Sequence, residues 1–200
     1  MPIQTSLFDD DAAAAPSAMP EGFRYAPALI DAGEEAALAA VIAALPLQPF
    51  VFHGYLANRR VASFGFRYDY SRRAVEQASD PPPLIAALRD RVAAFAGWAP
   101  GDVRQVLVTE YAPGAGIGWH RDKPQFGEVA GLSLLAPATL RLRRRDGHAW
   151  ARASCQLAPR SAYLLAGAAR DAWEHSIPAL ETLRYSLTFR TLAAGFTPAS

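Results

Sequence analysis

The chain contains a single cysteine, Cys155, which excludes an internal disulfide and any cysteine-rich zinc or iron–sulfur site. It also lacks an apolar run of transmembrane length, and its N-terminus lacks the basic-then-apolar pattern of a signal peptide. The formal net charge of +1 argues against binding a polyanion through overall charge, although a local basic surface remains open. These absences predict a soluble cytoplasmic protein, monomeric and without a membrane partner.

The length and composition favour one globular domain with its own core. The chain has 200 residues, of which 51% are hydrophobic. Residues 1–20 have three aspartates, an alanine run, Pro16 and Pro20, a pattern typical of a flexible tail. We therefore expect a single domain over 21–200, with helices and a hairpin in 21–100 and a β-rich core in 101–192.

Two stretches in the first half have apolar residues at helical spacing. Asp31 and Glu34 form a capping-box pattern before the run Ala36–Leu45, which Pro46 ends. A second amphipathic helix is predicted over Leu84–Trp98, directly after three consecutive prolines.

An aromatic segment from Pro49 to Tyr70 lies between these two helices. After an apolar turn over Phe50–Gly54 and the pair Arg59-Arg60, residues alternate in character so that Phe64, Phe66 and Tyr68 share one face. This pattern predicts a β-hairpin with an aromatic face. Core packing and ligand stacking both remain open for that face.

The second half of the chain is dominated by short β patterns separated by turn signals. The predicted strands are Val103–Tyr111, Glu128–Leu135, Ala138–Arg145, Ala149–Leu157, Ser161–Leu165 and Arg184–Leu192. Helices followed by a run of short antiparallel strands predict an α+β fold with a sandwich or jelly-roll barrel.

The pair His120-x-Asp122 closes a glycine-rich loop after the first of these strands. If this segment is extended, both side chains point to the same face, so an imidazole nitrogen and a carboxylate oxygen meet at one point. A second histidine, His175, lies in a distant segment. Together they match the 2-His-1-carboxylate facial triad that binds non-haem Fe(II) and leaves open positions. His53 and His148 fall in turns and are read as solvated.

The segment Arg184–Arg190 places two arginines and two hydroxyl residues on one strand face: Arg184, Ser186, Thr188 and Arg190. Buried guanidinium groups need anionic partners, and a planar carboxylate suits their geometry best. Open iron positions call for a bidentate ligand plus dioxygen. 2-Oxoglutarate meets both needs, with keto-acid oxygens on iron and its distal carboxylate on an arginine.

Three segments together resemble the AlkB family of Fe(II)/2-oxoglutarate-dependent dioxygenases: Tyr111–Lys123, His175–Pro178 and Arg184–Arg190. The resemblance runs from Val103 to Leu192. It implies that His120, Asp122 and His175 bind Fe(II), that Arg184 pairs with the distal carboxylate of 2-oxoglutarate, and that Arg190 and Tyr111 complete that pocket. Where the family often has Asn, this chain has Thr109, whose hydroxyl we expect to take its place, and Ser186 joins the same pocket.

The resemblance also implies a fold and a reaction. The fold would be a double-stranded β-helix (jelly-roll) core with N-terminal helices and a β-hairpin nucleotide-recognition lid. The reaction would be oxidative dealkylation of N-alkylated DNA bases of the 1-methyladenine or 3-methylcytosine type, in which the methyl carbon is hydroxylated and formaldehyde is released. Such an enzyme must hold the base outside the stack. The partner would therefore be alkylated DNA or RNA.

The aromatic hairpin is where this resemblance places the lid. Phe64, Phe66 and Tyr68 would stack on the base, and Phe52 at the turn would wedge into the gap. Several arginines would meet phosphates: Arg59, Arg60, Arg67, Arg72 and Arg73. Trp119 and Trp173, which flank the ligands, are expected to pack beside the metal site.

Other interpretations remain open at this stage. The same chemistry could act on a tRNA base or a protein side chain, or the chain could be a non-catalytic binding module on the same fold. Arg141, Arg143 and Arg145 share a strand face, which could be a nucleic-acid groove or simply a solvated outer surface.

Overall fold

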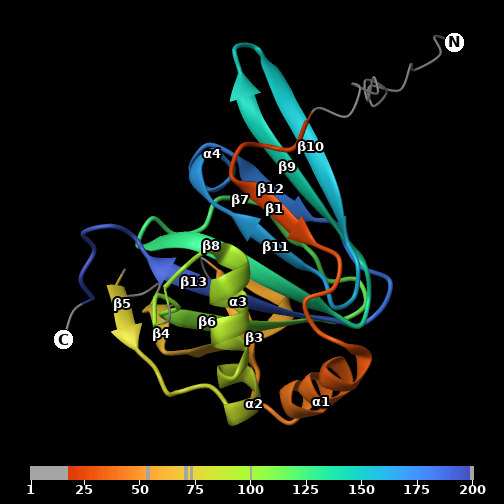
Figure 1. Cartoon of the computed structure of the whole chain (residues 1–200). Helices are drawn as coiled ribbons and strands as arrows, with labels where there is room; N and C mark the ends of the chain where they lie inside the picture. Colours follow the sequence, from red (N-terminus) through yellow and green to blue (C-terminus); the bar gives the residue numbers. More distant parts are fainter. Residues whose placement is uncertain (1–17, 53–54, 70–71, 73, 100, 199–200) are drawn as a thin grey trace, which may run out of the picture.

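Strands make up most of the regular secondary structure of the described residues, and eleven of the thirteen form two facing antiparallel sheets (Figure 1). The structure is a computed structural model that describes residues 18–52, 55–69, 72, 74–99 and 101–198, without the side chains of residues 51, 52 and 55–57. In spatial order, the major sheet contains β2 (Gln48–Phe52), β3 (Tyr55–Phe64), β6 (Gln105–Tyr111), β13 (Arg184–Leu192), β8 (Phe126–Leu134), β11 (Ala162–Leu165) and β1 (Phe23–Ala26).

The minor sheet is shorter and lies across from the middle of the major one. Its strands, in spatial order, are β10 (Ala149–Leu157), β9 (Ala138–Asp146), β12 (Glu174–Ile177) and β7 (Ile117–His120). From β6 onward the chain alternates between sheets, because β7, β9, β10 and β12 belong to the minor sheet and β8, β11 and β13 to the major one. This alternation builds the jelly roll and confirms the α+β expectation.

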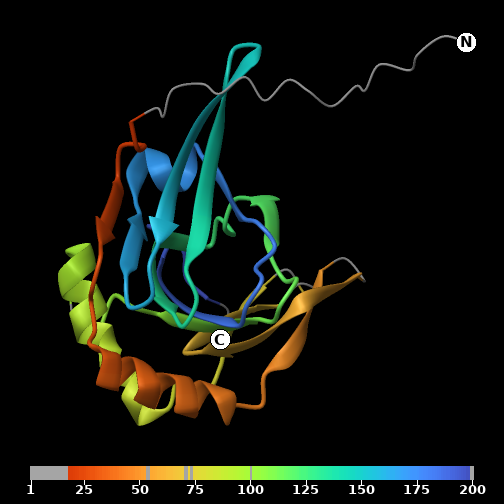
Figure 2. The same ribbon diagram turned by 90° about the vertical axis from the view of Figure 1, so that its right-hand side faces the viewer.

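Helices cover the outer face of the major sheet, and Figure 2 shows them outside the curved sheets. They are α1 (Ala32–Ala43), α2 (Pro83–Ala86) and α3 (Leu88–Ala96). The short α4 (Gly167–Asp171) lies before β12, and its Ala169 packs in the core cluster between the two sheets. Leu38, Ile42, Ile85 and Val92 of these helices pack with major-sheet residues such as Leu187 in one core cluster. Burial of these apolar side chains drives the helices onto the sheet.

The predicted capping box of α1 is confirmed. The Asp31 carboxylate accepts a hydrogen bond from the Glu34 amide at 2.8 Å, and the Glu34 carboxylate accepts one from the Asp31 amide at 3.0 Å. These bonds satisfy amides that would otherwise lack an intrahelical partner. The helix therefore begins at Ala32, four residues earlier than the apolar run alone indicated.

The prediction of one continuous helix over Leu84–Trp98 was wrong in one respect, because the structure has two helices, α2 and α3, divided at Ala87. Ile85, Leu88 and Val92 are nonetheless all buried, so the helical spacing correctly identified the packed face. Gly97, with φ of 76°, ends α3 in the left-handed conformation that glycine adopts without strain.

The aromatic segment forms two hairpins instead of one. Strand β3 pairs with β2 and with β6 of the major sheet, while β4 (Phe66–Asp69) pairs with β5 (Ala74–Gln77) in a separate two-stranded sheet. Gly65 divides them, with φ of 74° and a position at which a Cβ atom would lie 2.4 Å from the Arg104 carbonyl oxygen. Among the described helices, none is long and apolar enough to cross a membrane.

Candidate metal centre and its cavity

The inner faces of the two sheets enclose the site. On the major sheet, the register aligns Arg184 with Tyr111 and Ser186 with Thr109, so these four side chains share one face. On the minor sheet, His175 of β12 pairs directly with His120 of β7. The strand pairings thus assemble residues that lie far apart in sequence.

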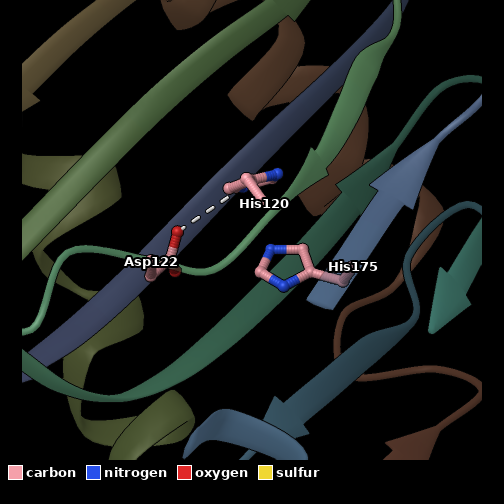
Figure 3. A group of neighbouring side chains, drawn as sticks. All are labelled: His120, Asp122 and His175. Carbon is pink, nitrogen blue, oxygen red and sulfur yellow. Dashed lines mark ion pairs between the residues drawn. The ribbon is translucent and has the colours of Figure 1, made fainter. Parts of the chain in front are cut away.

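His120, Asp122 and His175 converge as the sequence predicted, and Figure 3 shows the two imidazoles beside the carboxylate. Their potential ligand atoms all lie within 4.8 Å of one another. The His120 and His175 ring centres are 4.2 Å apart, and the His120 Nε2 atom is 3.7 Å from Asp122 Oδ1. Asp122 reaches this point because it follows His120 by two residues, just beyond the end of β7.

The protonation states suit metal binding. His120 Nδ1 lies 2.9 Å from the Gly118 carbonyl oxygen, which can only accept, so Nδ1 carries the hydrogen and Nε2 is left as the ligand. Burial lowers the pKa of His175 to about 4, despite the opposing effect of Asp122. Burial raises the pKa of Asp122, but Arg190 and the two imidazoles outweigh it and hold that pKa well below the ordinary value.

Two neutral imidazoles and one carboxylate are the ligand set of a non-haem Fe(II) facial triad, which leaves further coordination positions for other ligands. Arg190 supports this arrangement from the major sheet. Its Nε donates to Asp122 Oδ2 at 3.3 Å, and its Nη1 donates to Gln105 Oε1 at 2.9 Å. Arg190 therefore fixes the carboxylate that the metal would share.

Arg184 provides the test of whether a carboxylate co-substrate fits. Its side chain is fully buried, and Nε donates to Ser133 Oγ at 3.0 Å. Within the described structure, its Nη1 and Nη2 atoms are buried and have no hydrogen-bond partner. An unpaired buried guanidinium is costly, and a carboxylate would complete it through two parallel bonds. The residues present therefore fit 2-oxoglutarate.

A cavity of about 530 Å³ contains the triad. Of the residues predicted for the 2-oxoglutarate pocket, four line it: Thr109, Tyr111, Ser186 and Arg190. Arg184 is not among the lining residues, but its guanidinium carbon is 5.2 Å from the centre of the Tyr111 ring, which does line the cavity. The cavity volume falls in the usual range for small-molecule sites.

The lining also includes residues that sequence reasoning missed. Tyr163 of β11 lines the cavity, and burial raises its pKa to about 12, so its hydroxyl stays protonated. Phe50, Arg121 and Lys123 line the cavity too. A strand over Ser161–Leu165 was predicted, but its residues from Ala162 to Leu165 are all apolar or aromatic and buried, so the sequence did not show that Tyr163 faces the cavity.

The predicted lid residues divide into different environments. Arg59 lines the cavity, with its guanidinium 4.3 Å from the Phe50 ring centre. Its neighbour Arg60 points to the opposite face and makes two bonds to Glu110, at 2.7 and 2.8 Å. Alternation along β3 explains this difference, because consecutive side chains leave opposite faces of the sheet.

The aromatic residues expected to stack on a base do not line the cavity. Phe64 is buried in the core between the major sheet and the helices. On β4, Phe66 lies beneath Arg104, and Tyr68 lies beneath Lys123 with 4.9 Å between the ammonium and the ring centre. Tyr68 thus contacts Lys123, which lines the cavity.

The remaining residues that the sequence assigned to the lid or to the surroundings of the metal lie in several different places, and some are outside the described residues. Arg67 and Arg72 both form ion pairs with Glu76. Arg73, His53 and the side chain of Phe52 lie outside the described residues. Of the two tryptophans expected beside the metal, Trp173 is buried in the core between the sheets, while Trp119 lies at the cavity edge.

Comparisons with known proteins agree with this geometry. Residues 44–190 match the family model described as the 2OG-Fe(II) oxygenase superfamily. Over 147 residues the chain is 31% identical to the alkylated DNA repair protein ALKBH8 homolog of Arabidopsis thaliana, covering 62% of this chain and 42% of that relative. The chain therefore spans less than half the length of this curated relative.

Solved structures share the fold at low sequence identity. The structure of OsALKBH1 matches with a TM-score of 0.64 and 15% identity, covering 87% of this chain and 98% of that one. A 2OG-Fe(II) oxygenase family oxidoreductase from Burkholderia pseudomallei matches with a TM-score of 0.63 and 17% identity, covering 90% and 89%. With the family match over most of the sequence and the assembled triad, the chain belongs to the 2OG-Fe(II) oxygenase superfamily as an AlkB-like, Fe(II)- and 2-oxoglutarate-dependent oxygenase.

Proposed function

We propose that this chain oxidises an alkyl substituent on a nucleic-acid base that is already unstacked, with a base in a single-stranded RNA loop, such as a tRNA base, as the first candidate. The observation that carries the proposal is a rim of three cations around the triad cavity: Arg59, Arg121 and Lys123. All three are at least partly exposed, so they lie where the cavity opens. Phosphates flanking a base in the cavity would meet positive charge there.

The residues of the chain have separate tasks in this reaction. His120, Asp122 and His175 would hold Fe(II), and Arg184 would hold the distal carboxylate of 2-oxoglutarate. When bound, the metal and 2-oxoglutarate supply the activation of dioxygen and the oxidation of a C–H bond. Leu107, Val129 and Ile177 in the cavity wall exclude water around the reacting group.

The surroundings of the lid aromatics favour a base that needs no extraction. An enzyme that acts on duplex DNA must flip the base out and compensate for the lost stacking. Phe64 is buried in the core, and neither Phe66 nor Tyr68 is among the residues that line the cavity. RNA loops present bases that are already splayed out, so they impose no such requirement.

The second candidate is repair of 1-methyladenine or 3-methylcytosine in single-stranded DNA. It is supported by the similarity to a relative named as an alkylated DNA repair protein. A single-stranded lesion also needs no extraction from a duplex, so the same cavity accommodates it.

One experiment separates these candidates. The purified chain is incubated with Fe(II), ascorbate and 2-oxoglutarate and with either unfractionated tRNA or methylated single-stranded DNA, and nucleosides are analysed by mass spectrometry. We expect an oxidised or dealkylated nucleoside from tRNA that requires 2-oxoglutarate and disappears in His175→Ala. Product from DNA alone would move the assignment to DNA repair. Conversion of 2-oxoglutarate to succinate without a change in either nucleic acid would contradict the nucleic-acid proposal.

A further inference from the structure

The β9–β10 hairpin extends well beyond the strands that support it. Strand β10 pairs only with β9, and β12 pairs with β9 only at residues 141–143. In the described structure, the part from Arg144 to Arg152 therefore has no third strand beside it. Figures 1 and 2 both show this end of the hairpin projecting away from the rest of the molecule. A two-stranded ribbon buries little apolar surface, so core packing does not explain the extra length of this hairpin.

The register gathers basic and aromatic side chains on one face of this hairpin. Arg145 pairs with Trp150, Arg143 with Arg152, and Arg141 with Ser154, and these residues alternate with the buried Leu140 and Leu142. Because Leu140 and Leu142 face the core between the sheets, the arginines face outward. We call this outward surface the Arg–Trp face: Trp119, Arg141, Arg143, Arg145, Trp150 and Arg152.

Arginines and tryptophans alternate in space across this face. The Trp119 ring centre lies 5.1 Å from the Arg141 guanidinium carbon and 4.4 Å from that of Arg143. The Trp150 ring centre lies 4.3 Å from Arg143 and 4.7 Å from Arg145. Such cation–π contacts hold the guanidinium groups in place without neutralising their charge.

The charge of the face is strongly one-sided. Among the described residues of the minor sheet, Arg141, Arg143 and Arg145 share this face with one carboxylate, that of Glu174, which accepts a hydrogen bond from Arg143 Nε at 2.7 Å. A solvated protein surface ordinarily intersperses both signs of charge. Trp150 is also only partly buried, at the projecting end of the hairpin. A partly exposed tryptophan flanked by Arg143 and Arg145 indicates a binding surface.

The face begins at the opening of the catalytic cavity. Trp119 lines that cavity and also lies beneath Arg141 and Arg143. Strands lie about 4.8 Å apart and rise about 3.4 Å per residue. The face therefore runs about 10 Å from β7 to β9 and about 14 Å further from Arg141 to Arg145. A strand that leaves the cavity could follow it for several nucleotides.

We propose that the Arg–Trp face binds a single-stranded segment of the nucleic acid whose modified base occupies the cavity, through phosphates on the arginines and base stacking at Trp150. Basic grooves interleaved with aromatic platforms are the general means by which proteins bind single strands. This inference rests on the proposed function, since that function places a nucleic-acid base in the adjoining cavity. An acidic polypeptide would match the charge but would make no use of the aromatic platforms.

The test measures binding of the whole chain to a labelled, unmodified single-stranded oligonucleotide by fluorescence anisotropy, with RNA and DNA of the same sequence in parallel. We expect Trp150→Ala to weaken binding about tenfold through lost stacking. Arg145→Gln should weaken it and lower the slope of log affinity against log salt by about 0.7. The matched control is Arg144→Gln. Arg144 directly precedes Arg145 on the same strand, and its guanidinium lies on the opposite face, over Trp173.

Each outcome of this test decides the proposal. If Arg144→Gln weakens binding as much as Arg145→Gln, only total charge matters and the Arg–Trp face is not the site. Displacement of the oligonucleotide by polyglutamate at equal charge concentration would also overturn it. Equal affinity for RNA and DNA would support binding through the phosphates and bases that both nucleic acids share. Stronger RNA binding would support an RNA strand on this face.

A second measurement separates this inference from the proposed function. Turnover is compared on a long modified oligonucleotide and on a modified trinucleotide too short to reach Trp150. If the inference holds, Trp150→Ala raises KM for the long substrate only. If wild-type enzyme oxidises both equally well and the variant matches it, the face is disproved and the proposed function stands. If neither substrate is oxidised but Trp150→Ala still loses oligonucleotide binding, the proposed function fails and the face remains.

Discussion

At the scale of single residues, Arg184 and Arg190 show that two arginines six residues apart on one strand face have different tasks. Arg190 is paired within the protein, to Asp122 and Gln105. Arg184 is fully buried and has two nitrogen atoms without partners among the described residues. The first arginine organises a metal ligand, whereas the second is left for an anion that arrives with the co-substrate.

Arg184→Met should therefore weaken 2-oxoglutarate binding about 100-fold, because losing one member of a buried charge pair costs about 2–5 kcal/mol. The free protein should be as stable as wild type or more so, since an uncompensated buried charge is removed. Tryptophan fluorescence of the Mn(II)-loaded protein measures the affinity, and thermal unfolding measures the stability. Arg91→Met, which removes a surface pair with Glu34, should leave 2-oxoglutarate affinity unchanged. Unaltered affinity in Arg184→Met would refute the assignment.

At the scale of elements, strand β3 directs the adjacent residues Arg59 and Arg60 to opposite faces of the major sheet, although the sequence assigned both the same role. Arg59 faces the cavity, and Arg60 faces the helix-covered side, where Glu110 binds it. The Glu110 side chain is 11% exposed and the Arg60 side chain 54%. The pair therefore holds a mostly buried carboxylate of β6 against the edge of β3.

This division predicts opposite effects of the same substitution at neighbouring positions. Arg60→Ala should lower the urea midpoint of unfolding, because Glu110 loses its partner, and should leave oligonucleotide affinity unchanged. Arg59→Ala should weaken oligonucleotide binding and leave the unfolding midpoint unchanged. Urea titration and fluorescence anisotropy of both variants provide the comparison. Weaker oligonucleotide binding in Arg60→Ala but not in Arg59→Ala would reverse the orientation described for β3.

At the scale of the whole molecule, the site joins the two sheets. His120 and His175 come from the minor sheet, and Arg184 and Arg190 come from the major sheet. Metal and 2-oxoglutarate bound together would therefore link the sheets. A ligand that binds only the folded state stabilises it in proportion to its concentration above Kd.

Mn(II) with 2-oxoglutarate should raise the Tm of the wild-type protein, with about 2.7 kcal/mol of stabilisation at ligand concentrations 100 times Kd. EDTA should reverse this increase. His175→Ala should abolish it, because the triad loses a ligand. His148→Ala should retain it, since His148 is exposed in the turn between β9 and β10. Differential scanning fluorimetry measures all four conditions, and an equal Tm increase in His175→Ala would exclude this metal site.

The ligand types, the α+β class and the bounds of six core strands to within two residues followed from the sequence alone. Strands β10 and β13 begin and end as predicted. The triad was predictable because His120-x-Asp122, His175 and the Arg184–Arg190 segment occur together in a pattern that resembles the AlkB family, and the capping box because it is local. Short elements such as β1 and α4 were missed, since four or five residues show too little periodicity.

Which face of each strand lines the cavity became known from the pairing and packing of the sheets. Both faces of the major sheet are covered, one by helices and the other by the cavity and the minor sheet, so apolar side chains occur on both. Alternation then shows that two faces exist without showing which is inside. For this reason the sequence could not distinguish Arg59 from Arg60, assign Phe64 to the core, place Tyr163 in the cavity, or decide the role of the Arg141–Arg145 run.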